Sequence, residues 1–95
     1  MFIIQLTYKV PLAEVDQYLE EHKLFLKKNY AQEVFLLSGR KQPRNGGIIL
    51  AQAENMSGIH NIIGEDPFYR NGIAEYQVTE FLPSMANEAW QTLIQ

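Results

Sequence analysis

The sequence lacks cysteine entirely and is poor in basic residues. Its 95 residues include no Cys, and eight Lys and Arg stand against eleven Asp and Glu, for a net charge of −3. Without Cys there are no disulfides, thiolate metal sites or cysteine nucleophiles, and this composition fits a reducing cytoplasm, where we expect the protein. The acidic balance argues against nucleic acid as a partner, because phosphate binding needs a basic face.

Long apolar runs and nucleotide-binding motifs are also missing. Gln5 and Lys9 interrupt the first apolar stretch too early for a signal peptide or a membrane span, so we expect a soluble protein with no membrane partner. No glycine-rich phosphate loop is present, and we expect no cofactor. The two histidines, His22 and His60, lie far apart in the sequence and give little support for a zinc site, so we predict no bound metal.

One amphipathic helix carries a polar residue on its apolar side. Apolar residues recur every three or four positions from Val15 to Tyr30, with charged residues between them, which predicts a helix. His22 falls on the apolar stripe, one turn after Tyr18 and one turn before Phe25. An unpaired imidazole buried there would cost about 1–3 kcal/mol. His22 is therefore either a core histidine bonded to a backbone carbonyl or part of a functional site.

The remaining residues predict an α+β domain. Strands are expected at 2–8, 33–38, 48–53 and 73–81, and a second helix is expected between a cap at Asn55 or Ser57 and Gly64. Asn45–Gly46 predicts a hairpin between the second and third strands. The order β-α-β-β-α-β is the split βαβ, or ferredoxin-like, fold. We expect one domain over 1–95, with its core at 2–81 and a C-terminal helical extension at 84–95.

The predicted sheet has apolar residues on both of its faces. Two helices can cover only one face, yet residues 35–37 and 48–50 are consecutive apolar residues that point to both. A second copy of the chain is the simplest cover for the other face, which predicts a homodimer or higher homo-oligomer. The predicted C-terminal helix, with Met85 and Trp90 available for burial, is a competing cover or an added part of that interface.

Asp66 is the candidate partner of His22. It follows the second helix, whose end can approach the first helix in a split βαβ fold. A bond from the carboxylate to one imidazole nitrogen would fix the tautomer and leave the other nitrogen free as a general base or acid. The alternative interpretation of Asp66 is a turn residue, because Asp-Pro is a common way to leave a helix.

Several motifs together resemble the YciI-like (YCII-related) family. They are His22 in mid-helix, Ser38-Gly39 at the end of the second strand, Gly46 and Gly47, Asp66-Pro67-Phe68 followed by Gly72, and a last strand ending at Glu80-Phe81. The resemblance spans about Phe2 to Phe81. It implies a ferredoxin-like dimeric α/β barrel, with relatives that include muconolactone isomerase and chloromuconolactone dehalogenase. It also implies a His and Asp pair in a pocket beside the sheet, and these roles fall on His22 and Asp66.

Three further residues are candidates for binding a substrate. Ser38 could offer its hydroxyl to a ligand or to His22, although a serine at a strand end is often a turn residue. Arg40 lies close enough to the end of the second strand to clamp a carboxylate. It departs from the family pattern, in which a small residue or proline follows Ser-Gly, and the alternative is a solvated hairpin tip. Phe68 is a core candidate that could also wall an apolar ligand pocket.

These residues support three functional hypotheses. In the first, the protein is an enzyme without a cofactor, in which His22 moves a proton on a small carbonyl- or lactone-bearing ligand and Asp66 orients the ring. Such chemistry includes isomerisation and elimination. In the second, the same residues serve a binding or sensor module for a small ligand. In the third, the chain is a dimerisation domain without catalysis.

Overall fold

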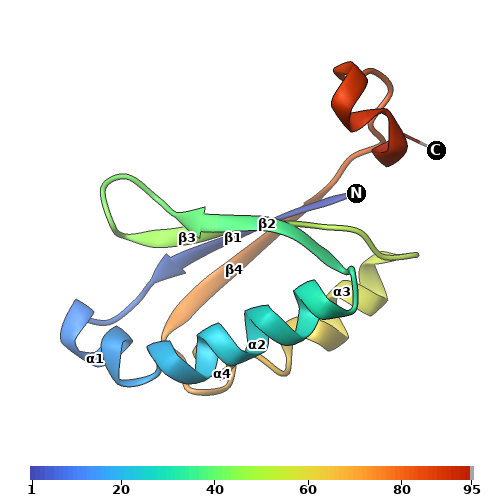
Figure 1. Cartoon of the computed structure of the whole chain (residues 1–95). Helices are drawn as coiled ribbons and strands as arrows, with labels where there is room; N and C mark the ends of the chain where they lie inside the picture. Colours follow the sequence, from blue (N-terminus) through green and yellow to red (C-terminus); the bar gives the residue numbers. More distant parts are fainter. Residues whose placement is uncertain (95) are drawn as a thin grey trace.

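A four-stranded antiparallel sheet forms one layer of the molecule, and the helices form the other (Figure 1). The computed structural model describes residues 1–94. In sheet order the strands are β2 (Phe35–Arg40), β3 (Gly46–Ala51), β1 (Phe2–Tyr8) and β4 (Ala74–Glu80). The predicted ferredoxin-like fold is confirmed.

The central strand β1 sets the inner face of the sheet. It pairs along its length with β3 on one side and β4 on the other. Because side chains alternate along a strand, Phe2, Ile4 and Leu6 all point to the helices, and each is at most 2% exposed. These three residues form the floor of the hydrophobic core and, at Leu6, of the cavity described below.

The predicted helix from Val15 to Tyr30 is two helices. α1 (Leu12–Gln17) and α2 (Leu19–Ala31) meet at Tyr18, where ψ is 3° and the chain turns. The Tyr18 N–H donates to the carbonyl of Val15, three residues back, instead of continuing the α-helical pattern. The break leaves His22 on the buried side of α2, as the spacing predicted.

The hairpin between β2 and β3 is shorter than predicted. Glu33 has a positive φ of 60° and turns the chain out of α2, so that β2 begins at Phe35 rather than at residue 33. β2 then continues through Gly39 to Arg40, which pairs with Gly47. Arg40 and Gly46 therefore belong to paired strands and not to the turn. Since Ser38 and Arg40 are two residues apart, they share one face of β2.

The segment between β3 and β4 contains two helices. α3 (Met56–Ile63) begins at Asn55, whose side chain accepts the Gly58 N–H and so caps it as predicted. The one-turn helix α4 (Pro67–Arg70) was not predicted and begins at Asp66. Gly72 follows with φ of +65°, which glycine adopts without strain, and leads into β4.

The predicted C-terminal helix is largely wrong. Residues 82–87 are not helical, and the only helix after β4 among the described residues is a 3₁₀ helix, η1 (Glu88–Leu93), with no buried residue. Figure 1 shows this segment extending away from the sheet beyond the end of β4. A short helix needs an apolar surface to pack on, and this segment meets little of one. Met85 and Trp90 are accordingly exposed instead of covering the sheet.

The sheet face turned away from the helices is uncovered and partly apolar. Leu37 and Ile48, on this face, are 47% and 40% exposed.

Each helix among residues 1–94 is too short or too polar to span a bilayer.

Candidate active site

His22 and Asp66 form a buried hydrogen-bonded pair. Nδ1 of His22 lies 2.9 Å from Oδ1 of Asp66, although the residues are 44 positions apart in the sequence. His22 is 9% exposed and Asp66 is fully buried. The predicted contact is confirmed. α2 supplies the histidine, and the turn between α3 and α4 supplies the carboxylate.

The Asp66 carboxyl group makes three hydrogen bonds. Besides His22, the Phe68 N–H donates to Oδ1 at 3.0 Å, and the Tyr76 hydroxyl donates to Oδ2. The first of these caps α4, so the turn interpretation and the pairing interpretation of Asp66 both hold. The Phe68 N–H and the Tyr76 hydroxyl are donors, and an ionised carboxylate, which only accepts, satisfies both of them and a third donor. On this ground we assign the proton of the His22–Asp66 bond to Nδ1 of His22.

Tyr76 keeps its proton over a wide range of pH. Burial raises the pKa of the Tyr76 hydroxyl, and the negative charge of Asp66 raises that pKa further. The hydroxyl is thus a permanent donor to Oδ2. The contact of Tyr76 with Asp66 was not predicted from the sequence, where the one available signal is a tyrosine hydroxyl at a strand position that faces the helices.

Phe68 fixes the plane of the imidazole. The His22 and Phe68 rings are stacked, with centroids 4.1 Å apart and an interplanar angle of 6°. Phe68 is also the residue whose N–H binds Asp66, so one residue orients both members of the pair. Since Nδ1 of His22 is engaged by Asp66, Nε2 is the nitrogen left for a ligand.

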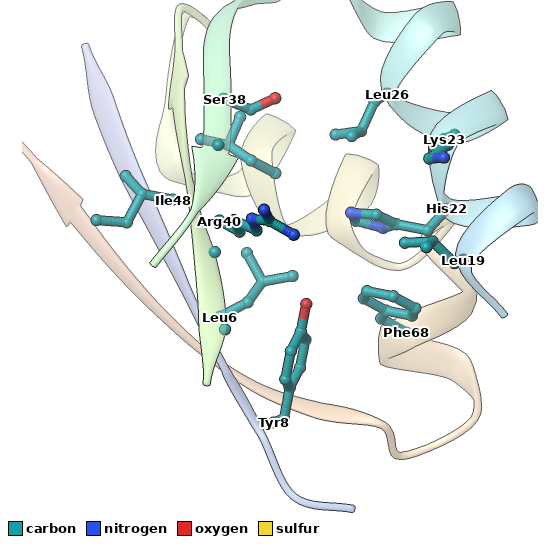
Figure 2. A pocket seen from close by; sticks show the side chains of 14 residues that line it. Leu6, Tyr8, Leu19, His22, Lys23, Leu26, Ser38, Arg40, Ile48 and Phe68 are labelled. Carbon is teal, nitrogen blue, oxygen red and sulfur yellow. The ribbon is translucent and has the colours of Figure 1, made fainter. Parts of the chain in front are cut away.

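A cavity of about 170 Å³ lies in front of His22, between α2 and the sheet. Its lining residues come from α2, the three strands β1, β2 and β3, and α4: Leu6, Tyr8, Leu19, His22, Lys23, Leu26, Ser38, Gly39, Arg40, Gly46, Gly47, Ile48, Ile49 and Phe68. Figure 2 shows the His22 ring extending into this space and the Tyr8 hydroxyl pointing toward it. Asp66 stays behind the histidine and is not part of the wall.

The structure places all five predicted site residues at or behind this cavity. Phe68 and Ser38 line the cavity. The Ser38 hydroxyl forms a hydrogen bond with the Tyr30 hydroxyl of α2 and none with His22 in the described part of the chain. Arg40 lines the cavity and extends toward the His22 ring from the opposite wall (Figure 2). Tyr8 is an additional lining residue that was not predicted from the sequence.

His60 lies apart from this site. It is exposed on α3, and it is absent from the cavity wall. Among residues 1–94 no group of three or more His, Cys, Asp or Glu side chains is arranged to hold a metal ion.

The fold and the site define a class: a ferredoxin-like α+β protein with a histidine–carboxylate pair behind a small cavity. Residues 1–82 match the profile of the YCII-related domain, and the chain belongs to this family. The match ends close to the last residue of β4 and leaves out the segment that carries η1.

A solved structure shares the fold. It is a 5-chloro-2-hydroxyhydroquinone dehydrochlorinase (TftG) from Burkholderia phenoliruptrix AC1100, in complex with 2,5-dihydroxybenzoquinone. The two chains are 18% identical with a TM-score of 0.67, and the alignment covers 85% of this chain and 93% of the other. A search of curated protein sequences found no match.

Proposed function

We propose that the protein catalyses proton transfer on a small carbonyl- or lactone-bearing ligand, with His22 as the general base and acid. The observation that supports this most is the His22 Nδ1–Asp66 Oδ1 bond of 2.9 Å behind an open cavity. It leaves Nε2, the basic nitrogen of this tautomer, as the atom available to a ligand. Asp66 is a positioning residue, because it acts through the imidazole.

The chemistry follows from this arrangement. Nε2 takes a proton from a carbon next to the ligand carbonyl, and the C–H electron pair moves toward that carbonyl as an enolate. The imidazolium formed is stabilised by the Asp66 carboxylate. Returning the proton to another carbon completes an isomerisation, and loss of a leaving group from the adjacent carbon completes an elimination. Ser38, Arg40 and Phe68 are ligand contacts in this proposal, because all three line the cavity.

The structural neighbour gives limited support for elimination. That protein is named a dehydrochlorinase and was solved with a small hydroxyquinone. At 18% identity the likeness establishes the fold, and the reaction of this chain rests on the pair and the cavity.

We also propose that two copies of the chain associate through the uncovered face of the sheet. Leu37 and Ile48 on that face are too exposed for a well-covered sheet, and a twofold arrangement would bury them against their own copies. Sedimentation at micromolar concentration tests this, and a stable monomer would contradict it.

Proton transfer is tested by deuterium exchange in D₂O. The ligands are small carbonyl and lactone compounds, including 4-oxopentanoate and γ-butyrolactone, and loss of the C–H signal next to the carbonyl is followed by NMR. We expect exchange above the buffer rate with the wild type, and at least about a hundredfold less with His22→Asn, in line with the usual contribution of a general base.

His60→Asn is the matched control, since it removes the other histidine at an exposed position. Equal exchange by wild type and His22→Asn would contradict catalysis by His22. Saturable binding of these compounds without exchange would favour the sensor or binding module instead.

A further inference from the structure

Three basic residues follow one another along the β2–β3 hairpin, and two of them have partners. The Nζ of Lys41 donates to Thr7 Oγ1 at 3.2 Å. The guanidinium of Arg44 lies 2.6 Å from Oδ1 of Asp16 in α1 and ties the hairpin to that helix. Arg40 makes neither an ion pair nor a side-chain hydrogen bond with residues 1–94, and it is the one of the three that lines the cavity.

The register of the sheet places Arg40 opposite the histidine–carboxylate pair. Arg40 pairs with Gly47, Gly47 with Leu6, and Leu6 with Tyr76, so the four residues form one row across all four strands. Directly opposed residues of paired strands share a face, and here it is the face toward α2. Tyr76 at one end holds Asp66, whereas Arg40 stands at the other end.

Gly47 keeps the space between the two ends open. It lies between Leu6 and Arg40 in the row and lines the cavity. Any side chain at position 47 would stand on the helix-facing side of the sheet, where the cavity lies. The absence of a side chain there gives a ligand room to reach from His22 to Arg40.

The cavity wall carries positive charge without negative charge. Arg40 and Lys23 are its basic members, and no Asp or Glu is among its lining residues. The Nζ of Lys23 lies 3.7 Å from Oε1 of the exposed Glu20. Among residues 1–94, Arg40 forms no ion pair with an acidic side chain. The remaining wall is mainly apolar. Arg40 itself is exposed, so its guanidinium is accessible to a ligand, and a charge-assisted pair with a carboxylate is stronger than a hydrogen bond to a neutral group.

We propose that Arg40 selects ligands that carry a carboxylate, so that the substrate class is a small carbonyl compound with a carboxylate group. The planar guanidinium can bind both carboxylate oxygens, and Figure 2 shows it extending toward the His22 ring across the cavity. A ligand held at Arg40 therefore presents its other end to Nε2 of His22. The substrate class rests on the proposed function, but the carboxylate preference does not require catalysis.

The preference is tested with two compounds of nearly equal shape, 4-oxopentanoate and its neutral amide, 4-oxopentanamide. Each is titrated into ¹⁵N-labelled protein while the amide signals of the cavity residues Gly39 and Gly47 are followed. We expect the carboxylate to bind the wild type at least about tenfold more tightly than the amide. Arg40→Gln should reduce this ratio to about twofold or less, since a neutral side chain cannot form the charge-assisted pair.

Lys41→Gln is the matched control: it removes the same charge from the same hairpin, at a side chain that contacts Thr7 outside the cavity wall. It should keep the tenfold ratio. Three results would overturn the proposal: Arg40→Gln keeps the preference, Lys41→Gln loses it equally, or the wild type shows no saturable shift with the carboxylate. His22→Asn separates this proposal from the catalytic one, because it should lower deuterium exchange at least about a hundredfold and retain the carboxylate preference.

Discussion

Glu65 and Asp66 are neighbours in the sequence, and each reaches back to α2, but the two contacts differ in kind. Glu65 meets Lys28 at 3.0 Å, and Asp66 meets His22 at 2.9 Å. The side chains of the first pair are 54% and 55% exposed, whereas those of the second are 0% and 11% exposed. At almost equal distance, water screens one pair and is excluded from the other. Burial and the number of donors, rather than separation, should decide which pair matters for stability.

The largest expected effect is that of Asp66→Ala. It removes the partner of His22, the acceptor of Tyr76 and the cap of α4 at once. We expect a loss of about 3–5 kcal/mol in the free energy of unfolding, measured by urea denaturation. Asp66→Asn keeps an acceptor oxygen of the same shape and should lose clearly less. An equal loss in Glu65→Ala would contradict the comparison.

Tyr76→Phe tests the donor at the far side of the carboxylate. The substitution leaves Oδ2 of Asp66 buried without its Tyr76 partner, which should cost about 1–3 kcal/mol at pH 7. Urea denaturation measures this loss, and Tyr69→Phe, at an exposed tyrosine of α4, is the control. A stability equal to that of the wild type would show that the buried pair does not depend on this donor.

Alkaline pH should reduce the contribution of Tyr76. Its pKa is raised in the folded protein by burial and by Asp66, whereas a tyrosine in the unfolded chain ionises near pH 10. Below about pH 10 the Tyr76 hydroxyl is protonated in both the folded and the unfolded protein, and it contributes fully to the free energy of unfolding. Above it the unfolded state releases a proton that the native state keeps, and stability falls by up to about 1.4 kcal/mol per pH unit. The difference between wild type and Tyr76→Phe should therefore shrink from pH 9 to pH 11, and a constant difference would contradict this.

The smallest expected effect is that of Glu65→Gln. The exposed pair with Lys28 should contribute about 0.2–1 kcal/mol at low salt. In 1 M NaCl the difference from wild type should vanish, because the screening length falls to about 3 Å. Chemical denaturation at both salt concentrations measures it. A loss as large as that of Asp66→Ala would remove the distinction between the two pairs.

The sequence predicted the site where local pattern was enough. The helical period placed His22 on a buried face, and chain order together with the family resemblance brought Asp66 to it. The catalytic and binding roles of His22, Asp66, Ser38, Arg40 and Phe68 stay predictions, because geometry alone does not test them.

Features that depend on register or on packing partners escaped the sequence analysis. Tyr76 lies on the inner face of β4, and its bond to Asp66 depends on how β4 packs against the turn before α4. The interruption between α1 and α2 occurs at Tyr18, where the sequence has neither Gly nor Pro, the residues that usually indicate the end of a helix. Periodicity predicted a helix in the C-terminal segment, and the prediction failed because periodicity does not tell whether a surface is present for that helix to pack on.

The shared oxygen of Asp66 offers a spectroscopic probe of the site. Oδ1 accepts both the His22 ring proton and the Phe68 backbone N–H. The exchange rate of that single amide with solvent therefore reports whether the carboxylate is in place, without labels or substrate. A ligand that reorganises the histidine should change the protection of Phe68 before it changes any other amide of α4.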